Sequence, residues 1–207
     1  MVKDAKREAL QILINCASIY KQFLLNKNVL VVTQEKQSIC YLEISFPRHA
    51  YLHLTGVDID EDKISAKQFF NLCADKKLKL SDFNLKDDGT TRLKLDVLPM
   101  LLKINGSIKM LCTYNGDRPK LYTEKLAGNI RGCLGLVQSG NYYVPNTVLN
   151  TDTRDEGTNH QRVLFMMEKG SKDKFYTDIV YIAKKIIIEE LNVPANIKVK
   201  IDNTRIS

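Results

Sequence analysis

Residues 130–137 read Ile-Arg-Gly-Cys-Leu-Gly-Leu-Val, a short and mostly apolar run that contains two glycines. Such a run is typical of a buried β-strand, and a glycine inside a strand marks a bulge or a close approach to the backbone. Similar runs separated by turn residues lie on both sides of it, and nine of the ten glycines lie at or after Gly89. The second half of the chain is therefore predicted to form antiparallel strands.

The neighbouring strands are expected where apolar residues cluster between polar turns. Asn115-Gly116-Asp117 is typical of a hairpin turn. Residues 197–201 alternate between apolar and polar and are compatible with a last short strand. The other expected strands cover residues 108–114, 121–123, 142–149, 163–167 and 175–183, and a helix is the alternative for the last of these.

The first half has a different pattern. Apolar residues recur every three or four positions in residues 4–25, which predicts an amphipathic helix. Two β-branched or alternating runs, 29–33 and 40–46, are separated by a polar turn and predict a hairpin. Ser65 and Gln68 have the spacing of a capping box, so a helix is expected to begin there, and a leucine-rich helix is expected over residues 91–103.

Helices and a hairpin followed by a run of strands indicate an α+β fold, with N-terminal helices packed on an antiparallel β-sheet. We expect a single domain over residues 1–207. Its parts are an N-terminal helix (1–27), a segment with the hairpin and further helices (28–105), and a mainly antiparallel strand region (106–207).

Composition limits the class of protein. The chain is 44% hydrophobic and 27% charged, as expected for a soluble globular protein, and no apolar run is long enough to span a bilayer. The mixed-charge N-terminus does not resemble a signal peptide, so we expect a cytoplasmic protein without membrane contacts. The net charge of +7 is compatible with a polyanionic partner such as RNA, and equally with a solvated lysine-rich surface.

The sequence contains no phosphate-binding glycine loop, no dinucleotide-binding motif and no paired-histidine metal motif. Its five cysteines are scattered, which argues against a disulfide framework or a zinc site. We therefore expect neither a metal nor a cofactor.

The candidate catalytic histidine is His53, within Tyr51-Leu52-His53-Leu54-Thr55-Gly56. Histidine is the side chain best suited to proton transfer near neutral pH. A structural histidine beside Leu52 and Leu54 is the alternative. The small Thr55 and Gly56 that follow would let a substrate approach closely.

Most other candidate residues lie far along the chain. Lys125 could neutralise a phosphate, and Asn146 and Thr147 could donate hydrogen bonds to phosphate oxygens. Each could instead be an exposed lysine or part of a side-chain-stabilised turn. Together with His53 they could supply an acid, a base and cations around a phosphorane, as a metal-independent ribonuclease requires. Further candidates for substrate binding are Thr55, Tyr122, Arg131, Tyr143 and Arg154.

Six short motifs, in this order and spacing, resemble the phage-associated nucleases of the barnase–EndoU–colicin–RelE class, specifically the stand-alone group of Firmicutes and their phages. The motifs extend over roughly residues 20–185. They are Tyr51 to Gly56, Ser65-Ala66-Lys67, Asp88-Gly89-Thr90-Thr91, Leu121 to Leu126, Gly132-Cys133-Leu134-Gly135 and Tyr142 to Thr147.

This resemblance implies helices packed on a four- or five-stranded antiparallel sheet with the active site on the exposed sheet face. It also implies RNA cleavage without a metal, in a bacterial host cell, by a protein that a phage or mobile element encodes. An immunity or host protein would be a further partner. By this resemblance His53, Lys125 and Thr147 are the catalytic residues, Asn146 is the polar partner of Thr147 at the strand end, and Tyr122 and Tyr143 are the aromatic positions.

Two other functions remain open on the sequence. One is a non-catalytic protein that binds RNA or a protein, for instance an inhibitor of a bacterial defence system. The other is an ADP-ribosyltransferase, because a His-x-Thr sequence followed by tyrosines and a glutamate resembles the NAD-binding pattern of that class.

Overall fold

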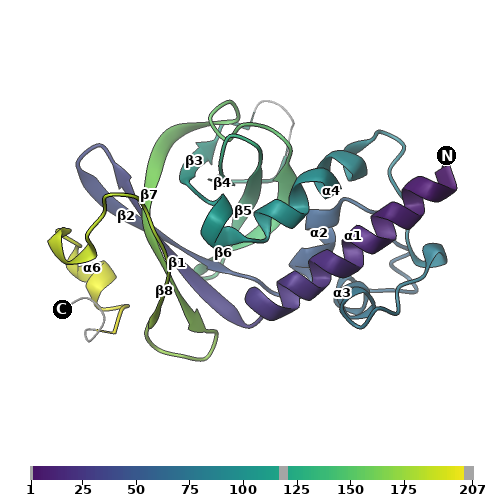
Figure 1. Cartoon of the computed structure of the whole chain (residues 1–207), viewed down its shortest axis with the longest axis horizontal. Helices are drawn as coiled ribbons and strands as arrows, with labels where there is room; N and C mark the ends of the chain where they lie inside the picture. Colours follow the sequence, from purple (N-terminus) through teal and green to yellow (C-terminus); the bar gives the residue numbers. More distant parts are fainter. Residues whose placement is uncertain (1, 117–120, 203–207) are drawn as a thin grey trace.

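The computed structural model describes residues 2–116 and 121–202, with most of the helices at one end and the sheet and the C-terminal segment at the other (Figure 1). Helix α1 (Val2–Phe23) confirms the N-terminal amphipathic helix and buries one stripe that includes Leu13, Cys16 and Tyr20. The Tyr20 hydroxyl donates to the Pro47 carbonyl at 2.9 Å. This bond ties the helix to the chain that follows the first hairpin.

Strands β1 (Lys27–Glu35) and β2 (Ser38–Ser45) form the expected hairpin, in register from Asn28–Ser45 to Glu35–Ser38. Short helices follow: α2 (Ala50–Thr55), α3 (Ala66–Ala74), the 3-10 turn η1 (Leu80–Asp82), α4 (Thr90–Leu101) and α5 (Ile104–Ser107).

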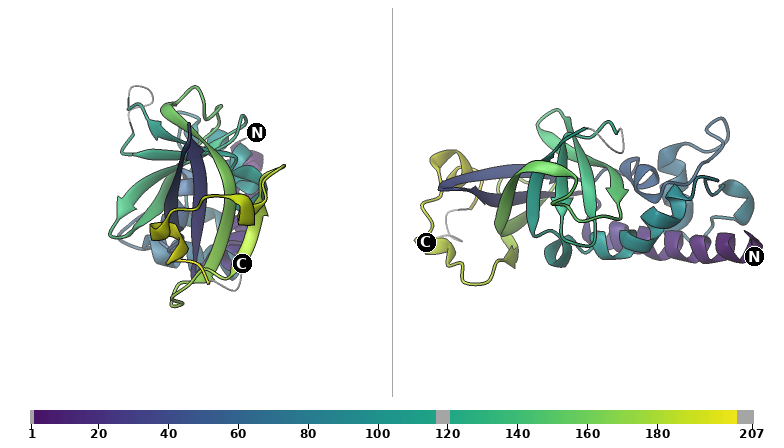
Figure 2. Two further views of the ribbon diagram at one scale, coloured as in Figure 1. Left: turned by 90° about the vertical axis from the view of Figure 1, so that its left-hand side faces the viewer. Right: turned by 90° about the horizontal axis from the view of Figure 1, so that it is seen from above.

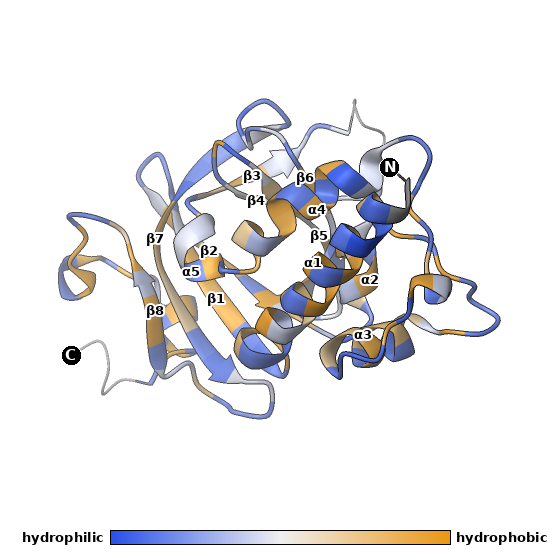
Figure 3. Cartoon of the chain, turned by 45° about the vertical axis from the view of Figure 1, so that its right-hand side comes forward, coloured by the Kyte–Doolittle hydropathy of each residue, from blue (hydrophilic) through white to orange (hydrophobic). Residues whose placement is uncertain are grey.

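The capping box at Ser65 is confirmed, because its hydroxyl accepts from the Gln68 amide and the Gln68 side chain accepts from the Ser65 amide. An aromatic cluster joins α1, α2 and α3, with ring centroids 5.4–6.3 Å apart; it comprises Tyr20, Phe46, Tyr51, Phe69 and Phe70. Hydrophilic and hydrophobic segments alternate along α1, whereas β1 and β8 are mostly hydrophobic (Figure 3).

The second half supplies the remaining strands of one eight-stranded sheet, in the order β1-β2-β6-β5-β4-β3-β7-β8. This sheet has more strands than the four or five that the resemblance implied. All strand pairs are antiparallel except β2–β6. The strands are β3 (Met110–Tyr114), β4 (Lys125–Gly128), β5 (Cys133–Ser139), β6 (Tyr142–Leu149), β7 (Gly157–Gly170) and β8 (Asp178–Ile182). Asp117 of the expected hairpin turn lies outside the described residues.

Strand β7 also pairs with β1, so that seven strands close on themselves and β8 lies outside them, beside β7 (Figure 2). The main hydrophobic core lies between the helices and this sheet and includes Leu13, Tyr51, Leu98, Leu134 and Val148. The helical end of the molecule therefore covers one end of the closed sheet.

A second core lies under the C-terminal segment, where Ile188 and Ile197 pack on Leu30 and Phe165. This segment contains the 3-10 turn η2 (Ile188–Glu190) and helix α6 (Ala195–Lys198). The last strand expected over residues 197–201 is wrong, because Pro194 begins a helical turn there and only Ile201 bridges to Tyr176.

Candidate functional site

A polar cleft of about 300 Å³ lies where α2, α4 and β6 meet, next to the segment that precedes β4. It brings four of the sequence-predicted residues together: His53, Tyr122, Asn146 and Thr147. The full lining is Leu52, His53, Gly56, Val57, Asp58, Ile59, Glu61, Lys86, Lys94, Leu121, Tyr122, Thr123, Asn146 and Thr147.

His53 lies in the last turn of α2 and is exposed to solvent. The His53 side chain is therefore not buried in the core. Its neighbours Leu52 and Leu54 are buried, because the helix turns those positions toward the core. The helix therefore presents His53 at the mouth of the cleft.

Thr55, expected to contact substrate, is fully buried, and its hydroxyl donates to the Leu52 carbonyl at 2.7 Å. This side chain satisfies one of the carbonyls that the end of a helix leaves without an intrahelical partner. Thr55 contributes to the end of α2 and does not line the cleft.

Gly56 follows in the left-handed conformation, with φ +68°, and its carbonyl accepts from the Thr91 hydroxyl at 2.6 Å. A Cβ atom at Gly56 would lie 2.6 Å from Cδ of Lys94. Glycine is thus favoured here both by the backbone conformation and by the Lys94 side chain that packs against it.

Lys94 is the functional candidate that sequence analysis missed. It lies on α4, and its ammonium donates to the His53 carbonyl oxygen at 3.2 Å. Burial, with a smaller contribution from nearby Lys86, lowers the pKa of Lys94 to about 8. A lysine with a strongly lowered pKa inside a cleft is a candidate for proton transfer or anion binding. In the sequence it is one of several polar residues on an amphipathic helix, and nothing distinguishes it from the others.

Asn146 and Thr147 both line the cleft, although successive residues of a strand normally point to opposite faces. The register explains this: Gly135 pairs with Thr147, and the next residue, Leu136, pairs with Pro145. Asn146 is therefore the extra residue of a β-bulge, and bulges turn side chains toward functional sites. Pro145, which lacks an N–H group, is the residue type that a bulge tolerates.

Asn146 also holds the segment before β4 in place. Its amide nitrogen donates to the Tyr122 carbonyl, and its amide oxygen accepts from the Thr123 hydroxyl at 3.1 Å. A Cβ atom at Gly135 would lie 2.5 Å from Thr147 and 2.9 Å from Thr123. The prediction that a neighbouring segment lies close to the backbone at this glycine is therefore confirmed. Tyr122 itself is 85% exposed at the mouth.

Lys125 does not line the cleft. Its ammonium donates to the Thr113 hydroxyl at 2.8 Å on the neighbouring strand β3. The adjacent residue, Leu126, pairs with Gly135, and a Cβ atom at Gly135 would face Thr147. Leu126 and Gly135 therefore lie on the same face of the sheet as Thr147. Because side chains alternate along a strand, Lys125 lies on the opposite face of the sheet. The lysines that line the cleft are Lys86 and Lys94 instead.

Three other expected binding residues lie elsewhere. Arg131 lines a separate groove, and exposed Arg154 forms an ion pair with Asp152. Tyr143 packs against the main core, where burial and then Glu124 raise its pKa.

Carboxylates lie at the rim of the cleft. Asp58 is 3.6 Å from the Lys86 ammonium, and Glu61 is exposed. Within residues 2–116 and 121–202, no group of three or more His, Cys, Asp or Glu residues is placed to hold a metal ion. Of the helices described, none is both long and apolar enough to cross a membrane.

Replacing Gly56 by alanine should destabilise the fold by about 1–3 kcal/mol, because a left-handed backbone is strained with any side chain and the new Cβ collides with Lys94. Chemical denaturation measures this loss. The matched control is Gly140→Ala, a turn glycine with φ +59° and no atom within 4 Å of an added Cβ. Equal losses in the two variants would contradict the close packing of Lys94 on Gly56.

Comparison with known families gives a match that covers most of the chain. A family model described as phage-Barnase-EndoU-ColicinE5/D-RelE like nuclease4 matches residues 12–185. No curated protein and no solved structure matches the chain.

Proposed function

The chain belongs to the phage-Barnase-EndoU-ColicinE5/D-RelE like nuclease4 family, and on this premise we propose that the cleft between α2, α4 and β6 cleaves RNA without a metal ion. The observation that carries the proposal is one contact. The Lys94 ammonium lies 3.2 Å from the carbonyl oxygen of His53, whose imidazole is exposed at the same cleft. The cleft thus combines a proton-transfer group with a partly desolvated cation, as phosphate transesterification requires.

In the proposed reaction His53 accepts the proton of the ribose 2′-OH, and the 2′-oxygen forms a bond to the adjacent phosphorus. The bond from phosphorus to the 5′-oxygen breaks, and the Lys94 ammonium donates a proton to that oxygen. A lysine pKa of about 8 suits a general acid near neutral pH. The products are a 2′,3′-cyclic phosphate and a 5′-hydroxyl, and proton exchange with water restores both side chains.

The remaining cleft residues position the substrate in this proposal. The Thr147 hydroxyl lies at the bulge, and exposed Tyr122 offers a ring on which a base can stack. Asn146 is engaged with Tyr122 and Thr123, so its role is to fix the shape of this wall.

The family description also supports a biological setting. We propose that the protein acts on RNA in the cytoplasm of a bacterial cell, as an effector that a phage or mobile element encodes. A host or immunity protein that covers the cleft would fit this setting.

The test is a cleavage assay on an RNA oligonucleotide and a DNA oligonucleotide of the same sequence, with and without EDTA. RNA cleavage that survives EDTA, with intact DNA, is expected. Tight and salt-dependent RNA binding without turnover would instead favour a non-catalytic RNA-binding protein.

A further inference from the structure

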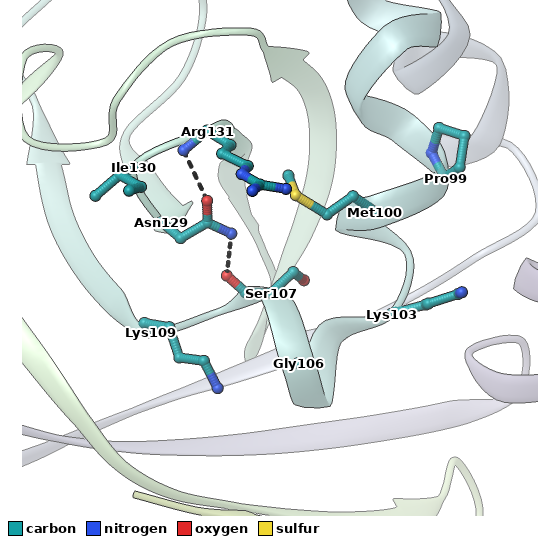
Figure 4. Close-up of a pocket in the computed structure, with 9 residues that line it drawn as sticks. All are labelled: Pro99, Met100, Lys103, Gly106, Ser107, Lys109, Asn129, Ile130 and Arg131. Atoms are coloured by element: carbon teal, nitrogen blue, oxygen red, sulfur yellow. Dashed lines mark hydrogen bonds between the residues drawn. The ribbon is translucent and has the colours of Figure 1, made fainter.

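A second concave surface lies beyond the cleft, along the same helix α4. It consists of two adjoining pockets of about 650 and 540 Å³ that share Met100, Ile130 and Arg131. We call this surface the outer groove. Figure 4 shows the larger pocket, where Arg131 extends toward Met100 and where Lys103 and Lys109 lie on either side of Gly106.

One wall of the outer groove is a loop that the fold holds rigidly. Asn129 donates its side-chain amide to the Ser107 carbonyl at 2.7 Å and accepts from the Arg131 amide at 2.7 Å (Figure 4). The Asn129 carbonyl accepts from both the amide and the hydroxyl of Thr153. These bonds fix the loop while Ile130 stays 62% exposed. A preorganised loop with an exposed apolar tip lowers the entropic cost of binding a partner.

The larger pocket of the outer groove is basic and apolar, whereas the smaller pocket, nearer the cleft, also contains the carboxylate of Asp96. Lys103, Lys109 and Arg131 line the larger pocket, and its described lining contains no carboxylate. Pro99, Met100 and Ile130 supply the apolar surface. The Lys109 ammonium lies 3.9 Å from the centre of the Tyr181 ring, which leaves Lys103 and Arg131 as the cations best placed for an anionic ligand.

Two walls lead from the cleft to the outer groove. Along α4, Met100 lies six residues after Lys94, an axial distance of about 9 Å at the usual helical rise. On the sheet side, Arg131 lies two residues before β5 and four residues before Gly135 of that strand, so the Cα atoms of Arg131 and Gly135 are at most about 14 Å apart. The strand β6 runs the same way, since Asn150 and Thr151 of the smaller pocket follow Thr147.

We propose that the outer groove binds the continuation of a single-stranded RNA whose scissile phosphate lies in the cleft. The backbone phosphates contact Arg131 and Lys103, and a base packs on Ile130 and Met100. At a stacked spacing of about 3.4 Å per nucleotide, the groove lies about three or four nucleotides from the cleft. This inference rests on the proposed function. An acidic protein could match the same charges, but continuity with the cleft favours RNA.

The test measures binding by fluorescence anisotropy, with a 12-nucleotide 2′-O-methyl RNA that the proposed reaction cannot cleave. In the double variant Lys103→Glu and Arg131→Glu the affinity should fall at least about tenfold, and the slope of log K against log salt should weaken by about 1–2. A four-nucleotide RNA should show much less difference between the variant and the wild type. The matched control is the double variant Lys172→Glu and Lys174→Glu, in the β7–β8 turn, which should bind like the wild type.

Unchanged affinity and salt slope in the groove variant would overturn the proposal and leave the surface to a protein partner. Failure of the wild type to bind the oligonucleotide would overturn it as well. Because the probe is not cleaved, binding that depends on Arg131 without any RNase activity would support the groove and contradict the proposed reaction. RNase activity of the wild type, together with unchanged RNA binding by the groove variant, would support the proposed reaction and contradict the groove.

Discussion

Replacing His53 by alanine is expected to slow RNA cleavage by about 10²–10⁴-fold, the usual contribution of a general base. His53 is exposed at the end of α2, so the substitution removes no core packing and should leave the free energy of unfolding nearly unchanged. Single-turnover cleavage with excess enzyme measures the effect on the chemical step.

The control for this variant is His160→Ala, which removes an exposed histidine of β7 that does not line the cleft. It should cleave RNA at the wild-type rate. Equal rates for His53→Ala and the wild type would show that His53 is not the base.

Replacing Lys94 by methionine should have two opposite effects. Cleavage should fall by about 10²–10³-fold, as when one transition-state donor is removed from an active site. The folded protein should become more stable by about 1–2 kcal/mol at pH 7, because a desolvated charge is replaced by an apolar chain of similar length. A residue that reduces stability and supports activity is typical of a functional site.

The lowered pKa of Lys94 also predicts how the stability of the protein changes with pH. The pKa of Lys94 is about 8 in the folded protein, against an ordinary value of 10.5. Between these two pH values the unfolded chain binds more protons, so wild-type stability should gain from rising pH in this window. The Lys94→Met variant should lack this gain, and its stability advantage should shrink by pH 10.5.

Urea unfolding at several pH values, together with cleavage assays, tests both effects. Arg92→Met is the control on the same helix, because Arg92 is exposed and does not line the cleft. A Lys94→Met variant that is less stable and fully active would contradict the assigned role.

Local sequence patterns predicted most helices and strands. The stripe of α1, the hairpin and the Ser65 capping box depend on residues close together in the chain, and all three are confirmed. The pairing of β1 with β7 joins segments more than 120 residues apart and is not encoded in any short pattern. The helical turn after Pro194 was misread because four residues carry little periodicity.

In the candidate site, too, some residues could be predicted from the sequence and others depend on contacts between distant parts of the chain. His53, Tyr122, Asn146 and Thr147 were identified from the sequence and lie together. Lys125 was misplaced because the face of a strand residue depends on register, and the sequence alone did not fix the register of β4. Lys94 was missed because its burial arises only when α4 packs against Gly56, a contact between distant parts of the chain.

The most direct test of the RNase proposal uses a DNA oligonucleotide that contains a single ribonucleotide, incubated with the protein in EDTA. The proposed reaction needs one 2′-OH, so cleavage should occur only on the 3′ side of the ribonucleotide and leave a 2′,3′-cyclic phosphate, detectable by mass spectrometry. Cleavage at the deoxynucleotides, or a 3′-hydroxyl at the cut, would contradict it.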